Sequence, residues 1–178
     1  PAKTSYFRQV IARKGKEPLQ AAAVLLDTET GRIRAVYGGT DVTSTSFNRA
    51  TQARRQAGSA FKPLVYALAF SQKERDGKPR FTAASTEPNS PRTFRTPHGD
   101  WRPRNVGGEY TPTASLAHGL AWSQNIATAS LLEELGGPKA LIGFAARLGC
   151  DASRYPEEMG LALGQGEVTP LEMAEFVG

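Results

Sequence analysis

The sequence lacks several features by which common protein classes are identified. Its 178 residues include one cysteine, Cys150, so the chain can form no internal disulfide and no cysteine metal cluster. No apolar run reaches the roughly 18 residues that crossing a bilayer requires, and residues 1–10 carry no apolar segment of the signal-peptide kind. These absences predict a soluble piece of protein, which a secreted or membrane-tethered parent could equally contain. Cys150 follows a helical run, and we expect a small buried thiol there.

Composition favours one ordinary globular domain, because 39% of the residues are hydrophobic. The net charge is +5, and a basic stretch at residues 91–105 alternates arginines with Phe94 and Trp101. Such a stretch could hold phosphates and stack bases. Its prolines and its glycine predict a loop instead of a basic helix or a pair of aromatic strands, so we expect no nucleic acid partner. A basic surface suits other polyanions equally well, including an anionic membrane or a cell-wall polymer.

The first regular element is predicted at residues 20–39. An apolar run is followed by a turn in which Gly31 is expected to take a positive φ, and then by residues that alternate between polar and apolar. This pattern is typical of a hairpin, which would open an antiparallel sheet.

Helical patterns fill most of the second half, after an irregular region at residues 81–112 that prolines and glycines interrupt. The helices expected there lie within residues 111–137, broken near 122–125, at 138–148, and after Thr169, where Pro170 and Glu172 complete the signature of a capped helix start.

Helical periodicity also begins at Ser59, and one face of that helix carries Phe61, Leu64, Val65, Leu68 and Ala69. Residues three apart lie on one face, so the hydroxyl of Ser59 and the amine of Lys62 can come within hydrogen-bond reach. A lysine kept neutral by burial can accept the serine proton, and the amides of a helix N-terminus can stabilise an oxyanion. The arrangement fits acyl transfer. Taken alone, it equally fits a helix-capping serine beside a solvated lysine.

A second polar pair, Ser123 and Asn125, falls at the predicted helix break. Acyl transfer needs a group that relays a proton to the leaving group and an amide that orients the substrate, and this pair supplies both. The other interpretation is a loop pair that caps the next helix. Ser46 and Asn48 have the same spacing, so spacing alone does not distinguish the two pairs.

Four stretches occur in a distinctive order: AAAVLLDTETGRIRAVYGG, FNRATQARRQAGSAFKPLVYALAF, WRPRNVGGEYTPTASLAHGLAWSQNIATASL and LALGQGEVTPLEMAEF. In this order they resemble the transpeptidase domain of class A penicillin-binding proteins, the bifunctional peptidoglycan synthases. The resemblance covers about residues 19–176. It implies a mixed α/β (α+β) fold of the penicillin-binding serine transpeptidase kind, in which an antiparallel sheet packs with helices. We expect the Ser59 helix to be buried against that sheet.

The resemblance also implies roles for individual residues. Ser59 matches the serine that the family acylates, Lys62 the base of its Ser-x-x-Lys motif, and Ser123 with Asn125 its Ser-x-Asn motif. Ser46 is set aside because its surroundings match a different segment of the family. The implied substrate is a peptidoglycan stem peptide ending in D-Ala-D-Ala, and β-lactam antibiotics are mimics that acylate the same serine.

The family's third motif, Lys-Thr/Ser-Gly, does not occur at the matching place. In the family that strand helps to bind the substrate carboxylate and supplies half of the oxyanion hole. We therefore expect residues 19–178 to be the N-terminal part of a transpeptidase domain, incomplete at its C-terminus and inactive alone, and residues 1–18 to be a linker. The resemblance further implies an extracytoplasmic location, a glycosyltransferase domain in the parent chain, and an N-terminal membrane anchor absent here.

Other functions remain open from the sequence. A class A β-lactamase shares both short motifs but also needs a Glu-x-x-Leu-Asn segment, which is missing. A non-catalytic sensor of the same fold would be expected to lack the third motif. His98 and His118 have no partners in a metal-binding pattern, so we expect them to be surface or packing residues and expect neither a metal nor a cofactor.

Overall fold

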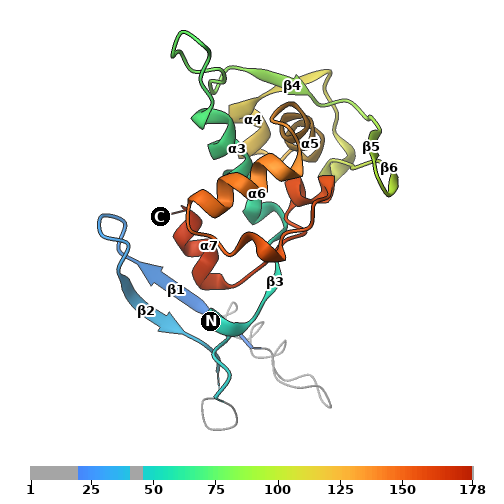
Figure 1. Cartoon of the computed structure of the whole chain (residues 1–178). Helices are drawn as coiled ribbons and strands as arrows, with labels where there is room; N and C mark the ends of the chain where they lie inside the picture. The colour runs from blue at the N-terminus through green and yellow to red at the C-terminus, as the bar shows by residue number, and fades with distance from the viewer. Residues whose placement is uncertain (1–19, 41–45, 178) are drawn as a thin grey trace, which may run out of the picture. The chain divides into compact units, whose positions relative to one another are not determined.

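The computed structural model describes residues 20–40 and 46–177, so the linker predicted at residues 1–18 lies outside the described residues. The chain divides into two compact units. Of the described residues, the smaller unit holds 20–40, 46–53 and 169–176, and the larger unit holds 54–168 and 177. Figure 1 shows the order of the elements along the chain.

The smaller unit contains the predicted hairpin. Strands β1 (Ala23–Leu26) and β2 (Ile33–Tyr37) pair antiparallel, and Gly31 in the turn has a φ of +67°, as expected. The carboxylate of Asp27 accepts hydrogen bonds from the backbone and the hydroxyl of Thr30, which ties the turn together. The pair forms a sheet of two strands.

Two helices of the smaller unit begin with side-chain caps. Helix α2 (Arg49–Gln52) follows Asn48, whose side chain accepts a hydrogen bond from the Ala50 amide at 3.0 Å. Helix α7 (Pro170–Val177) begins with the predicted capping box: the Thr169 amide donates to the Glu172 carboxylate at 2.7 Å, and the Glu172 amide donates to the Thr169 hydroxyl at 3.2 Å.

The larger unit is built around four helices, which gather into one bundle in Figure 1. They are α3 (Lys62–Ser71), α4 (Leu116–Ala121), α5 (Asn125–Glu134) and α6 (Pro138–Arg147). The break predicted near residues 122–125 separates α4 from α5, and the helix predicted at 138–148 is α6. Short antiparallel pairs complete the unit: β3 (Arg55–Gln56) with β8 (Glu167–Val168), β4 (Thr86–Pro88) with β7 (Thr113–Ser115), and β5 (Phe94–Thr96) with β6 (Gly99–Trp101).

Helix α3 lies in the core. It contacts α4, α5 and α6, and its predicted apolar face is buried, with Leu64 and Leu68 only 4% and 3% exposed. Before it, the ring of Phe61 meets the ring of Tyr155 edge to face at 5.3 Å. The helix is thus covered by other helices of its own unit, while its predicted packing against the hairpin sheet stays a prediction.

The structure corrects the expectations for residues 91–105 and for Cys150. Residues 91–105 were expected to form a loop without paired aromatic strands, but β5 pairs with β6 and places the rings of Phe94 and Trp101 5.5 Å apart. Gly99 has a φ of +114°, which permits the tight turn between these strands. Cys150 is half-buried and not fully buried, because it lies just beyond the end of α6.

Candidate active site

Ser59 lies in a tight turn and not in the α-helix that was expected to begin there. Residues Gly58–Phe61 form a 3-10 turn, and α3 begins only at Lys62. Gly58 has a φ of +56°, a left-handed conformation that favours glycine and turns the chain sharply before the helix. The turn leaves Ser59 exposed to solvent while Phe61 is buried, so the serine is accessible on a firmly anchored segment.

A neighbouring segment holds this turn in place. The amides of Ala57 and Gly58 donate to the carbonyls of Gly166 and Gly164, at 3.4 and 3.2 Å. A side chain at Gly164 would collide with the backbone of Gly58, so the close approach requires glycine there. The LGQG stretch noticed in the sequence therefore acts as a backbone support for the serine turn.

The amine of Lys62 is the centre of a buried polar cluster. Its Nζ donates to the Ser123 carbonyl at 2.7 Å, to Ser123 Oγ at 2.9 Å and to Asn125 Oδ1 at 2.6 Å. Lys62 is 1% exposed, although it is a charged residue type. The structure thus brings together three of the four residues singled out from the sequence. The fourth, Ser59, lies one turn before Lys62, but within the described part of the chain its hydroxyl makes no hydrogen bond to that amine.

Burial lowers the pKa of Lys62 from 10.5 to about 8, because desolvation disfavours the ammonium form. A neutral amine keeps a lone pair that can accept a proton, and it still has two protons to donate to oxygen. The hydroxyl of Ser123 can then reverse its direction and donate to Lys62. The cluster is therefore able to pass a proton between a lysine and a serine.

Ser123 has an unusual backbone conformation. With a φ of +53°, it is the one non-glycine residue of the described chain in the left-handed region. Such a conformation is unfavourable for a residue with a side chain and is concentrated at functional sites. It arises where the chain leaves α4 and enters α5 after three residues, and it directs both the carbonyl and the hydroxyl of Ser123 at Lys62.

A network of amide side chains holds the Ser123–Asn125 segment, and no pattern in the sequence indicated it. Asn125 Nδ2 donates to the Arg104 carbonyl at 2.7 Å. The buried side chain of Asn105 accepts a hydrogen bond from the Ile126 amide at 3.1 Å and donates to Asn89 at 3.0 Å. Asn105 thereby caps α5 from 21 residues away, so no local pattern could have marked it.

The remaining candidates take part in other contacts. Asn48, of the alternative Ser-x-Asn pair, caps α2. His98 is exposed and lies 3.7 Å from a Glu158 oxygen, and the His118 ring lies 6.1 Å from the Trp122 ring. Among residues 20–40 and 46–177, no group of three or more His, Cys, Asp or Glu side chains could hold a metal ion.

Comparison with known proteins gives consistent results. Residues 21–178 match the family model described as "Penicillin binding protein transpeptidase domain". The chain is 39% identical over 168 residues to penicillin-binding protein 1A of Neisseria lactamica, and 35% identical over 157 residues to that of Pseudomonas aeruginosa. These alignments cover 90% and 87% of this chain but only 20% and 18% of the relatives, so the chain spans about a fifth of their length.

Solved structures resemble the chain as well. The crystal structure of penicillin-binding protein 1A from Haemophilus influenzae has 34% identity and a TM-score of 0.78, over 90% of this chain and 23% of that one. The PonA1 protein from Mycobacterium tuberculosis in complex with penicillin V has 27% identity and a TM-score of 0.71, over 97% of this chain and 46% of that one.

Proposed function

The chain belongs to the penicillin-binding protein transpeptidase domain family, and we propose that it carries the acylation machinery of a peptidoglycan D,D-transpeptidase. The observation that carries the proposal is the buried amine of Lys62, held by Ser123 and Asn125 one turn after an exposed serine. A buried lysine with a lowered pKa beside a serine is the pairing that activates a hydroxyl nucleophile.

In the proposed reaction, Ser59 Oγ attacks the carbonyl carbon of the D-Ala-D-Ala peptide bond while its proton moves to the neutral Lys62 amine. The tetrahedral intermediate collapses, the bond to the terminal D-Ala breaks, and the leaving amine takes a proton relayed through Ser123. Asn125 orients the peptide by its side-chain amide. An amine of a second stem peptide then attacks the ester carbonyl of the acyl-enzyme. The new amide bond forms as the ester bond to Ser59 breaks, and the proton that the amine loses returns to Ser59 Oγ.

The tight turn contributes to the oxyanion hole in this proposal, since it carries the backbone amide of Ser59 just before α3. The family's Lys-Thr/Ser-Gly strand would supply the other donor, and no match to it occurs at the corresponding place in the 178 residues. Loss of one oxyanion donor costs about 3 kcal/mol, or roughly a hundredfold in rate. We therefore expect these 178 residues alone to be acylated far more slowly than the whole protein that contains them.

The proposed partners follow from the same chemistry. Stem peptides ending in D-Ala-D-Ala are the substrates, and β-lactam antibiotics acylate the same serine. Relatives are named penicillin-binding proteins, and the PonA1 structure was determined with penicillin V. We further propose an extracytoplasmic location, with a glycosyltransferase domain and a membrane anchor elsewhere in the parent. In the described part of the chain, no helix has the length and hydrophobicity to span a membrane.

Mass spectrometry of the whole protein after treatment with penicillin tests the proposal. The antibiotic should add its entire mass to the peptide containing QAGSAFK, because opening the ring expels no leaving group. Ser59→Ala should abolish the adduct, and the matched control Ser46→Ala, at the exposed serine of the alternative motif, should keep it. A label on any other residue would overturn the assignment.

The lifetime of the adduct addresses the hydrolase alternative. We expect it to persist for hours, because the sequence has no Glu-x-x-Leu-Asn segment to activate water. Release within seconds would instead favour a β-lactamase-like reaction.

A further inference from the structure

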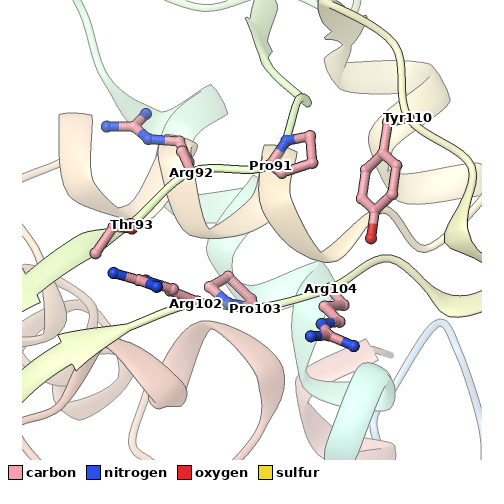
Figure 2. A pocket seen from close by; sticks show the side chains of 7 residues that line it. All are labelled: Pro91, Arg92, Thr93, Arg102, Pro103, Arg104 and Tyr110. Atoms are coloured by element: carbon pink, nitrogen blue, oxygen red, sulfur yellow. The ribbon is translucent and has the colours of Figure 1, made fainter.

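The segment that carries Arg104 lines a basic pocket, which has no part in the proposed acylation steps. Its volume is about 380 Å³. In Figure 2, the segments 91–93 and 102–104 form two of its sides and Tyr110 stands at one end. The side chains that line it are Pro91, Arg92, Thr93, Arg102, Pro103, Arg104 and Tyr110, among which three are arginines and none is acidic.

The three arginines differ in how far their charge is already compensated. Arg92 donates to Ser130 and forms an ion pair with Glu133 at 2.8 Å, so it is largely satisfied. Arg102 has only a 3.5 Å contact with Asp100, and its side chain is 71% exposed. Within the residues that the structure describes, the Arg104 guanidinium makes no hydrogen bond or ion pair. Two guanidinium groups at this pocket therefore have donors available for a ligand.

The backbone of Arg104 links the pocket to the buried polar cluster around Lys62. The carbonyl of Arg104 accepts the hydrogen bond from Asn125 whose other amide atom contacts Lys62. Pro103 and Asn105, on either side of Arg104, are buried, so the segment that carries Arg104 is held firmly. A peptide bound by Asn125 would therefore lie next to the segment that lines this pocket.

We propose that this pocket is a subsite for a carboxylate carried on a side chain of the peptide substrate, bound by Arg102 and Arg104. The inference rests on the proposed function, since it assigns part of that substrate. Arginine presents paired N–H donors that match the two oxygens of a carboxylate. The proline rings offer apolar surface to the methylene groups that would carry it, and a volume of about 380 Å³ has room for such a side chain.

Direct binding to the whole protein with Ser59→Ala tests the subsite without any chemistry. Isothermal titration compares two synthetic peptides ending in D-Ala-D-Ala, one with a glutamate-type side-chain carboxylate and one with the matching carboxamide. We expect the carboxylate peptide to bind at least about tenfold more tightly at low salt, since hydrogen bonds to charged groups are worth that much. The preference should shrink as salt is added.

Substitutions then assign the preference to the pocket. Arg104→Gln should bring the ratio of the two affinities closer to one. The double substitution Arg102→Gln with Arg104→Gln should bring it closer still. The matched control is Arg75→Gln, at an exposed arginine in the loop after α3, which should leave the ratio unchanged. Thermal unfolding of each variant checks that the fold is retained.

Three results would overturn the inference. The first is equal affinity of the Ser59→Ala protein for the two peptides, and the second is a preference for the carboxylate peptide that survives both pocket substitutions. The third is tighter binding of a phosphoserine-containing peptide than of the carboxylate peptide, which would make the ligand a phosphate. Penicillin labelling of Ser59 in the unsubstituted protein is measured as an independent test of the proposed function. A failure of labelling counts against the proposed function and a failure of the titration against the subsite.

Discussion

The protonation of Lys62 makes the sharpest prediction about the proposed reaction. Only the neutral amine can accept the proton of Ser59. With the pKa lowered by burial to about 8, about one molecule in ten has a neutral Lys62 at pH 7. With the ordinary value of 10.5, the neutral fraction would be roughly one in 3,000. Burial of this side chain therefore raises the reactive fraction at pH 7 by about 300-fold.

This can be measured as the second-order rate constant for acylation of the whole protein by a fluorescent penicillin between pH 6 and 10. The rate should rise about tenfold per pH unit up to about pH 8 and then level off, because the amine is mostly neutral above its pKa. Lys62→Arg keeps the positive charge but cannot lose its proton, so it should not be acylated at any of these pH values. Lys73→Arg, at an exposed lysine, is the matched control.

Three outcomes would contradict this role of Lys62. A rate that stays constant from pH 6 to pH 8 would mean that Lys62 is not the titrating base. A rate that keeps rising beyond pH 9 would mean that burial does not lower the pKa. Normal acylation of Lys62→Ala would transfer the role of base to another group, and Ser123 would be the first to examine because it contacts the same amine.

Three further predictions concern the framework of the site. Gly164→Ala should lower the free energy of unfolding by more than the roughly 1–2 kcal/mol that a left-handed alanine costs, because the added methyl group meets the Gly58 backbone. Gly149→Ala is the control, since Gly149 has a similar φ but open space around it. Equal losses for the two variants in urea unfolding would disprove the clash. Burial and a neighbouring carboxylate raise the pKa of Glu87 from 4.5 to about 7, so the folded state binds this proton more tightly than the unfolded state, and the free energy of unfolding should fall as pH rises between these values. Glu87→Gln should remove that fall. The same difference in the free energy of unfolding between pH 5 and pH 8 in both proteins would contradict this. Asn105→Ala leaves the buried Ile126 amide of α5 without its acceptor and should lower the free energy of unfolding by about 1–3 kcal/mol, which thermal unfolding measures. An unchanged melting temperature would mean that water replaces the cap.

Elements whose cause lies within a few residues could be predicted from the sequence. The capping box of Thr169 and Glu172 and the turn at Gly31 appear as expected, because each depends on a contact or a backbone angle within three or four positions. The burial of α3 followed from its apolar periodicity. The start of that helix was misplaced by three residues, because the 3-10 turn depends on support from the distant Gly164 segment.

The candidate site could be predicted from the sequence only in part. The spacing of Ser59 and Lys62 is local, and it placed them one turn apart. The contacts of Lys62 with Ser123 and Asn125 join residues 61 and 63 positions apart, and the Asn105 cap joins residues 21 positions apart. Spacing could name these side chains as candidates, but only packing of α3 against α4 and α5 brings them together and removes water from the amine. The lowered pKa of Lys62 is therefore a product of the tertiary structure, since desolvation depends on everything that surrounds a group and not on its neighbours in sequence.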